Sequence, residues 1–250
     1  MKSGLVSVSF RWLTPDEIIK ATAAAGLQGI EWGSDVHVPP DHPVLAKAVR
    51  DKTVDAGLTV SSYGTYFGLG KNSTDEFQKY LETAEILGTN ILRIWPPDKF
   101  RDKLSAEEYL HIVSNAETIA EMAKKCNKTV CLECHHETFT DNYKDEVNLI
   151  KDVGYDNFKT YWQPNFYKDL TYNISSAKAL QPYVENVHVF NWKGNQRFPL
   201  SDGVDEWKQY INILQCDSAD RWYLLEFMHD DKPTSLNPSA SVLNRLIKYK

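Results

Sequence analysis

The sequence predicts a single (β/α)₈ barrel, and three observations support this prediction. Short apolar segments of β type alternate with amphipathic segments of helical spacing along the chain. The alternation gives eight strand–helix units, which imply a parallel sheet with right-handed crossovers. A chain of 250 residues has the length typical of a barrel of eight such units. An open doubly wound sheet is the alternative architecture, but count and length favour one barrel domain over residues 1–250.

The predicted strands are runs of β-branched and aromatic residues that end at turns or polar segments. They lie at 5–10, 27–32, 58–63, 90–95, 129–134, 158–163, 184–192 and 221–227.

The predicted helices follow the strands in order and carry end signals. Thr14 is an expected N-cap followed by Pro15, and Gly26 is an expected stop. Ser73 opens a capping box, and Gly88 closes that helix. The remaining expected helices lie at 43–56, 105–125, 142–152, 173–180, 204–214 and 238–249.

Composition argues against several classes of partner. The chain has 28 Lys and Arg against 34 Asp and Glu, a net charge of −6, and nucleic-acid binding usually needs a basic surface. No segment resembles a signal peptide or a membrane span. Cys131 and Cys134 share a predicted strand without a second pair, so we expect structural thiols in a reducing environment. These observations predict a cytoplasmic protein that binds neither nucleic acid nor membrane.

Polar side chains occur late in four successive predicted strands. Glu133, Gln163, His188 and Glu226 should meet at the carboxyl end of the barrel, where active sites of this fold lie. A buried carboxylate needs an ionic partner or a metal. An oxygen-rich set with one imidazole suits Mn²⁺, Mg²⁺ or Co²⁺, and Zn²⁺ is also compatible. The sequence therefore predicts a divalent metal shared by these residues.

Each of these residues also has a purely structural interpretation. Glu133 can pair with a lysine or arginine at the rim, and Gln163 can hydrogen-bond a loop. His188 can be a satisfied core histidine, and Glu226 a surface residue. The shared height on successive strands favours the functional interpretation for the set as a whole.

With these residues placed, the chain resembles the xylose isomerase-like superfamily. The resemblance covers nearly the whole chain and rests on GIEWGSDVHVPPDH (29–42), LECHHETFTD (132–141), YWQPN (161–165), VHVFNWKGNQRFPLSDG (187–203) and LLEFMHDD (224–231). That family holds its metal with Glu, Asp, His and Glu, so Gln163 stands where an aspartate is usual. This departure implies a more weakly held metal, or a decayed site. The family's E-x-H-x-x-T pattern is met by Glu133, His135 and Thr138, and its arginine after the histidine strand falls on Arg197.

The resemblance implies an isomerase or epimerase of carbohydrate metabolism. The substrate would be a small ketose, sugar phosphate or hydroxy-carbonyl compound that chelates the metal. One of Glu133 and Glu226 would remove a proton, and the other would return one through an enediolate. Arg197 would stabilise the developing oxyanion. Relatives are often dimers or tetramers, so a homo-oligomer is compatible with the resemblance.

Further substrate contacts are expected around this centre. Trp32 and His37 follow the second predicted strand, and His135 shares strand parity with Glu133. By the same alternation, His136 should point away from His135.

Two alternative functions stay open, and a third is disfavoured. An inosose dehydratase-like lyase would expel a hydroxyl from the same enolate. A decayed barrel would bind a sugar without turnover, and Gln163 favours that possibility. An apurinic endonuclease shares the fold, but it needs more histidines than the 7 present and a basic groove.

Overall fold

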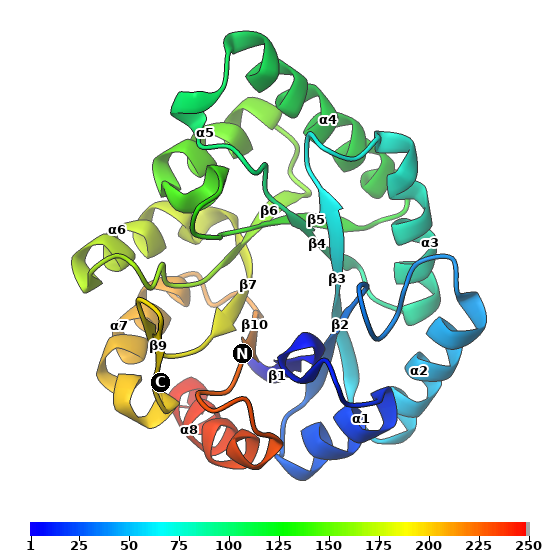
Figure 1. The fold of residues 1–250 in the computed structure, drawn as a ribbon, viewed down its shortest axis with the longest axis vertical. Helices are drawn as coiled ribbons and strands as arrows, with labels where there is room; N and C mark the ends of the chain where they lie inside the picture. The colour runs from blue at the N-terminus through cyan, green and yellow to red at the C-terminus, as the bar shows by residue number, and fades with distance from the viewer. Residues whose placement is uncertain (249–250) are drawn as a thin grey trace.

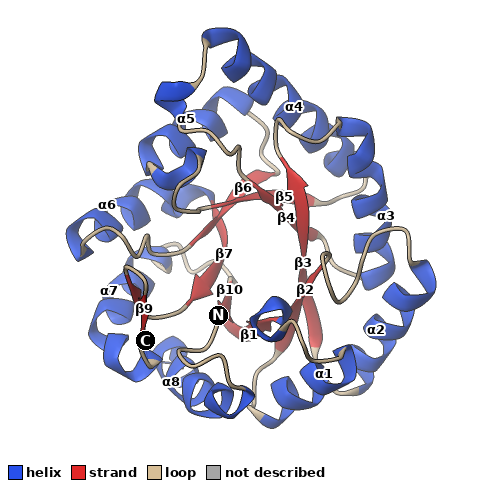
Figure 2. Ribbon diagram, in the orientation of Figure 1, coloured by secondary structure: helices blue, strands red, loops and turns tan. Residues whose placement is uncertain are grey.

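A computed structural model describes residues 1–248 and confirms the barrel. Eight parallel strands close on themselves in the order β1-β10-β7-β6-β5-β4-β3-β2, with the helices outside them (Figures 1 and 2). The barrel strands are β1 (Lys2–Val6), β2 (Gly29–Gly33), β3 (Thr59–Gly68), β4 (Ile91–Trp95), β5 (Thr129–Glu133), β6 (Phe158–Trp162), β7 (Val184–Val189) and β10 (Trp222–Leu225).

The helices begin and end close to their predicted signals. Thr14 caps its helix with a capping box to Glu17, and Ser73 forms the predicted box with Glu76. Gly88 adopts the left-handed conformation that ends its helix, with φ of 73°. The helices are α1 (Pro15–Ala24), α2 (Pro43–Asp55), α3 (Phe77–Leu87), α4 (Ala106–Lys125), α5 (Tyr143–Val153), α6 (Leu170–Leu180), α7 (Val204–Leu214) and α8 (Leu236–Lys248).

Boundaries of several elements differ from the prediction, and the third strand, for example, extends to Gly68. The first strand ends at Val6, because Ser7–Phe10 form a 3-10 turn over the barrel end. The seventh barrel strand ends at Val189, and the chain beyond it forms a two-stranded hairpin, β8 (Trp192–Lys193) with β9 (Gln196–Arg197). Position 249 of the predicted last helix lies outside the described residues.

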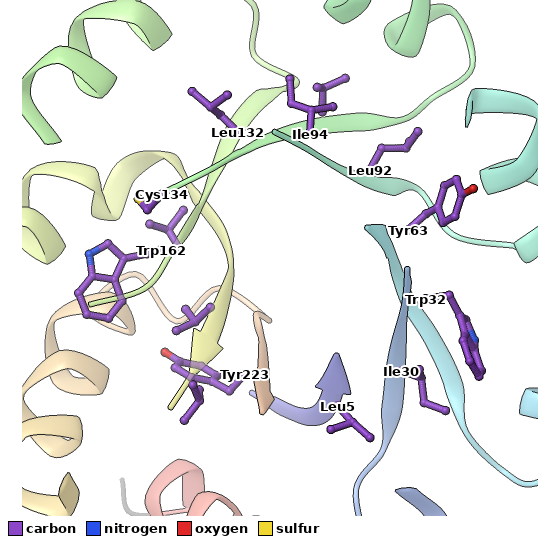
Figure 3. Packing of buried hydrophobic residues seen from close by; sticks show 14 of the residues in the cluster. Leu5, Ile30, Trp32, Tyr63, Leu92, Ile94, Leu132, Cys134, Trp162 and Tyr223 are labelled. Atoms are coloured by element: carbon purple, nitrogen blue, oxygen red, sulfur yellow. The ribbon is translucent and has the colours of Figure 1, made fainter. Parts of the chain in front are cut away.

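Most of the hydrophobic core lies between the strands and the helices. Trp32, Tyr63 and Trp162 point away from the barrel axis into this layer (Figure 3). A smaller apolar cluster fills the barrel interior, where Cys131, Tyr161 and Trp222 pack together. Because side chains alternate along a strand, the residues between the outward ones face the axis.

The inward-facing positions at the carboxyl end are polar. Glu31 from β2, Arg93 from β4, Glu133 from β5 and His188 from β7 are all at most 2% exposed. Gly64 on β3 makes room for them, since a Cβ there would lie 2.7 Å from Nη2 of Arg93. The fold therefore places a buried ionic layer directly below the mouth of the barrel.

Within the described chain, no helix is long and apolar enough to cross a membrane.

Candidate metal centre and active site

The structure brings the four predicted ligand residues together. Glu133 is the last residue of β5, His188 lies in β7, and Gln163 and Glu226 directly follow β6 and β10. Nδ1 of His188 lies 3.0 Å from Oε1 of Gln163, 3.4 Å from Oε2 of Glu226 and 3.6 Å from Oε1 of Glu133. One donor atom each from Glu133, His188 and Glu226 fall within 4.8 Å of one another. Oxygen atoms from the ends of three strands, each able to bind a metal, thus lie around one imidazole nitrogen.

The opposite nitrogen of the same imidazole faces a fourth carboxylate. Nε2 of His188 lies 3.6 Å from Oε1 of Glu31, and both side chains are fully buried. A carboxylate behind a histidine favours the proton on that side and leaves the other nitrogen free as a ligand. With a cation bound, Glu31 would favour the proton on Nε2 and leave the lone pair of Nδ1 to the ion, whereas in the metal-free chain Nδ1 lies at donating distance from Oε1 of Gln163.

Glu133 has a direct ionic partner within the chain, which is Arg93. The guanidinium of Arg93 donates from Nε to Oε1 of Glu31 at 2.9 Å and from Nη1 to Oε2 of Glu133. It lies in the barrel interior rather than at the rim. Arg93 thus bridges two carboxylates on different strands, and Oε1 of Glu133 is left facing His188.

This ionic layer shifts the pKa values of its members in opposite directions. Burial alone would raise the pKa of Glu133, but Arg93 and then His188 lower it below its ordinary value. Burial raises the pKa of Glu226 above its ordinary value, and Glu133 adds to this effect, although His188 opposes it. Burial would lower the pKa of His188, but Glu226, Glu133 and Glu31 raise it to about 10. Without a cation, the buried carboxylates therefore favour a protonated His188, and Glu226 takes up a proton more readily than an ordinary glutamate.

The residues present fit a divalent cation. Three carboxylates, Glu31, Glu133 and Glu226, against the one guanidinium of Arg93 leave a formal charge of −2 when His188 is neutral. A divalent ion would neutralise that charge, and carboxylate, amide and imidazole donors suit Mg²⁺ or Mn²⁺. Glu133, Gln163, His188 and Glu226 would hold the ion, with Glu31 and Arg93 behind them.

A cavity of about 220 Å³ opens above this centre at the barrel mouth. Its floor contains Arg93, Glu133, Gln163 and Glu226. Its walls are mostly rings, and they include Val8, Arg11, Tyr66, Trp95, His135, His136, Phe166, Phe190, Trp192 and Phe227. A small ligand in this cavity would contact the floor with one edge and aromatic side chains with the others.

His135 lines the cavity, but the expected divergence from His136 is wrong. The two rings stack with centroids 4.3 Å apart, and both line the wall. The strand ends at Glu133, so side-chain alternation no longer applies to the residues that follow. Nδ1 of His135 lies 2.7 Å from the carbonyl oxygen of His136, which fixes the ring against Trp95.

The structure does not bring the other three expected substrate contacts into the cavity. Trp32 is fully buried on the outer face of the barrel wall (Figure 3). Both ring nitrogens of His37 have intramolecular partners, the hydroxyl of Ser7 and the carbonyl of Leu13. Arg197 lies on β9 at the rim, stacked 4.4 Å from the ring centroid of Trp192 and ion-paired with Asp231.

The place of Arg93 and Glu31 in the site was not predicted from the sequence. Arg93 stands in the middle of an apolar strand, NILRIW, and a charge at such a position signals a polar barrel interior. Glu31 and Trp32 are adjacent in one strand, so only one of them can face the axis. A choice of Glu31 as the inward residue would have excluded Trp32 from the site.

Comparison of the chain with solved structures shows the same fold. A probable 3-DHS dehydratase, AsbF, from Bacillus anthracis is 20% identical, covers 98% of this chain and 99% of its own, and has a TM-score of 0.80. D-psicose 3-epimerase from Clostridium cellulolyticum H10 is 13% identical over 99% of both chains, with a TM-score of 0.75. A Mycobacterium smegmatis protein solved in complex with magnesium is 12% identical over 99% of this chain and 97% of its own, with a TM-score of 0.75.

Family membership rests on the sequence profile. No curated protein matches the chain. The profile described as "Xylose isomerase-like TIM barrel" matches residues 19–246, which is most of the chain. The chain therefore belongs to the xylose isomerase-like TIM barrel family.

Proposed function

We propose that the protein is a divalent-metal-dependent isomerase or epimerase of a small hydroxy-carbonyl compound of the ketose type. One observation carries this proposal: Glu133, Gln163, His188 and Glu226 converge on one point that opens to the cavity. A divalent cation bound there would polarise a substrate carbonyl and so acidify the neighbouring C–H bond. The epimerase structures of similar fold support the reaction class.

The two catalytic glutamates would have unequal roles. Oε2 of Glu133 is held by Arg93, so this carboxylate is fixed in position and keeps its negative charge. Within residues 1–248, Glu226 forms its ion pair with His188, at 3.4 Å, and the guanidinium of Arg93 lowers its pKa only as a weaker charge interaction. Glu226 therefore has an oxygen available to a substrate, and we assign it the first proton transfer. Glu133, at the other side of His188, would face the opposite side of the substrate.

A dehydratase is the second candidate. The structure with a TM-score of 0.80 is a probable 3-DHS dehydratase. The same proton removal would then be followed by loss of a hydroxyl β to the carbonyl rather than by reprotonation. The two outcomes differ in product but not in the first step.

Solvent exchange tests the first step for both candidates. The protein with Mn²⁺ is incubated in heavy water with a panel of ketoses, inososes and hydroxypyruvate, and proton NMR follows each compound. We expect deuterium at the carbon next to the carbonyl of a substrate, and new alkene signals if the enzyme is a dehydratase. Glu226→Gln should lower the exchange rate by about 10²- to 10⁴-fold.

A matched control removes a carboxylate outside the site. Glu121→Gln on α4 changes an exposed side chain and should leave exchange unchanged. Isothermal titration calorimetry with Mn²⁺ on each variant separates loss of metal from loss of the base. Full exchange activity in Glu226→Gln would refute the assigned role, and absence of Mn²⁺ binding to the unmodified protein would refute the metal-dependent function.

A further inference from the structure

Glu226 lies one residue beyond β10, so the regular geometry of the strand does not by itself fix its side chain. Separate hydrogen bonds hold the peptide planes on its two sides. The N–H of Glu226 donates to the carbonyl oxygen of Val189 on β7 at 3.0 Å, and the N–H of Phe227 donates to the hydroxyl of Ser9 at 2.9 Å. Because each peptide unit is planar, the two bonds together fix the direction in which the Glu226 side chain leaves the backbone.

Ser9 supplies the hydrogen bond that β1 would supply if that strand continued. Successive N–H groups of a strand point to opposite neighbours, so the N–H of Phe227 points toward β1 when that of Glu226 points toward β7. β1 pairs with β10 as far as Leu5 and Leu225, and the chain then forms the 3-10 turn. The hydroxyl of Ser9, a residue that is 1% exposed, therefore takes the place of a backbone carbonyl.

Phe227 adopts a backbone conformation that its own side chain disfavours. Its φ is 47°, in the left-handed region, where bulky side chains are uncommon. Glu226 and Phe227 both line the cavity, although consecutive residues of an extended strand face opposite sides. A strained conformation persists only when its surroundings hold it. Here the hydroxyl of Ser9 holds the N–H of Phe227, and the ring of Trp192 packs 5.8 Å from its ring.

The 3-10 turn holds β2 by the same device on its other side. The hydroxyl of Ser7 accepts from the N–H of Gly33 at 2.9 Å. Gly33 ends β2 and lies two residues after Glu31, which is behind His188. Of the two serine bonds, that of Ser9 is therefore the one that acts on a peptide plane of a proposed metal ligand.

We propose that Ser9 is a positioning residue for Glu226. Its hydroxyl holds the peptide plane after Glu226, and this directs the carboxylate toward His188, whose Nδ1 lies 3.4 Å from Oε2 of Glu226. Ser9 does not line the cavity, so its effect passes through the backbone. The inference rests on the proposed function, in which Glu226 holds the cation and receives the first proton.

A double-mutant cycle tests whether Ser9 acts through Glu226. Isothermal titration calorimetry with Mn²⁺ compares the unmodified protein, Ser9→Ala, Glu226→Gln and the double variant. We expect Ser9→Ala to weaken Mn²⁺ binding by about tenfold when Glu226 is present. In the Glu226→Gln background it should weaken binding by less than about twofold, because the carboxylate that Ser9 positions is then absent. Ser9→Thr keeps the hydroxyl and should restore most of the affinity.

A matched control and a metal-free measurement separate positioning from a general loss of structure. Ser239→Ala on α8 removes another buried hydroxyl, which donates to the carbonyl oxygen of Ser235 at 2.8 Å, and should leave Mn²⁺ affinity unchanged. Ser9→Ala should lower the thermal unfolding midpoint in EDTA by about 1–6 °C, because the N–H of Phe227 loses its partner. This fall should be smaller in the Glu226→Gln background, where no displaced carboxylate adds to the loss.

The outcomes separate this proposal from the proposed function. Equal weakening of Mn²⁺ binding by Ser9→Ala in both backgrounds would overturn the role of Ser9, and so would an unchanged affinity in the Ser9→Ala variant or an equal loss in Ser9→Thr. Coupling between Ser9 and Glu226 without deuterium uptake into any compound would support the role of Ser9 and count against catalysis.

The metal-free cycle decides the role of Ser9 if the unmodified protein binds no Mn²⁺, a result that would refute the proposed function. Equal falls of the midpoint in EDTA in the two backgrounds would then overturn the positioning of Glu226 by Ser9. A smaller fall in the Glu226→Gln background would support it.

Discussion

Replacement of Arg93 by methionine should destabilise the barrel more than any surface charge removal. The change keeps an apolar side chain of similar length but leaves Glu31 and Glu133 without their guanidinium, and these carboxylates are 0% and 2% exposed. Removal of one partner from a buried ion pair costs about 3–5 kcal/mol, because the remaining charge stays buried. His188 does not offset this loss by taking up a proton, because the neighbouring carboxylates raise its pKa to about 10 and it already carries that proton at neutral pH. We therefore expect a loss within that range.

Thermal unfolding in EDTA measures this loss. In a domain of this size, 1 kcal/mol shifts the midpoint by about 2–4 °C, so a loss of about 3–5 kcal/mol predicts a fall of about 6–20 °C. Circular dichroism follows the transition. Arg50→Met is the matched control, because Arg50 pairs with Asp51 at the surface, where an ion pair contributes about 0–1 kcal/mol.

Divalent metal should reverse part of the effect. Without Arg93 the formal charge of the ionic layer falls from −2 to −3, so a cation gains more from binding. A ligand that binds the native state alone raises the midpoint. The rise caused by millimolar Mg²⁺ or Mn²⁺ should therefore be larger in Arg93→Met than in the unmodified protein.

Two results would refute this reasoning. If Arg93→Met in EDTA lowers the unfolding midpoint no more than Arg50→Met does, the burial of Glu31 and Glu133 does not depend on the guanidinium. A smaller metal-induced rise in Arg93→Met would mean that Arg93 supports the cation rather than opposing it. Arg93→Lys keeps the positive charge, so its unfolding midpoint in EDTA should lie between those of the unmodified protein and Arg93→Met. It should not restore the full stability, because an ammonium lacks the planar fork that reaches both carboxylates.

Three further predictions concern individual members of the site and its support. Gln163→Asp adds a negative charge to the donor set and should tighten Mg²⁺ binding by at least about tenfold in calorimetry, whereas weaker binding would speak against Gln163 as a ligand. Glu31→Gln removes the charge behind His188 and should weaken Mg²⁺ by about 10- to 100-fold; an unchanged affinity would contradict the orienting role. Burial raises the pKa of Glu146 from 4.5 to about 7, so the stability gained from its neutral form is complete below pH 4.5 and lost as pH rises through 7. Glu146→Gln should therefore show a flatter pH dependence of the unfolding midpoint, with a gain of up to about 3 kcal/mol above pH 8; parallel profiles would contradict this sign.

The convergence of the four candidate ligand residues was predictable from sequence because of connectivity. In a parallel barrel every strand ends at the same rim, so Glu133, Gln163, His188 and Glu226 had to be neighbours once the strands were assigned. No estimate of side-chain conformation was needed for that step. The same logic predicts which rim carries chemistry, but not which side chains reach across the barrel.

The role of Arg93 was not predictable in the same way. Its side chain is long enough to reach Glu133 on the adjacent β5 and Glu31 on β2, which is separated from β4 by β3. Strand order gives the neighbours of a residue, whereas a contact across the interior depends on the space that Gly64 leaves. The position of Arg197 was unpredictable for a related reason, because it depends on the hairpin after β7, which strand periodicity does not describe.

Arg93 and Gln163 act in the same direction on the proposed metal. An amide in place of a carboxylate removes one negative charge from the donor set, and the guanidinium withdraws electron density from Glu133 through Oε2. Both changes leave more positive charge on a bound cation, which would be held less tightly but would polarise a carbonyl more strongly. Glu31 limits this effect, because it shares the charge of Arg93 and also supports His188 from behind. The barrel interior would therefore set both the affinity for a cation and the acidity that the cation gives a substrate, and Glu31 would balance the two.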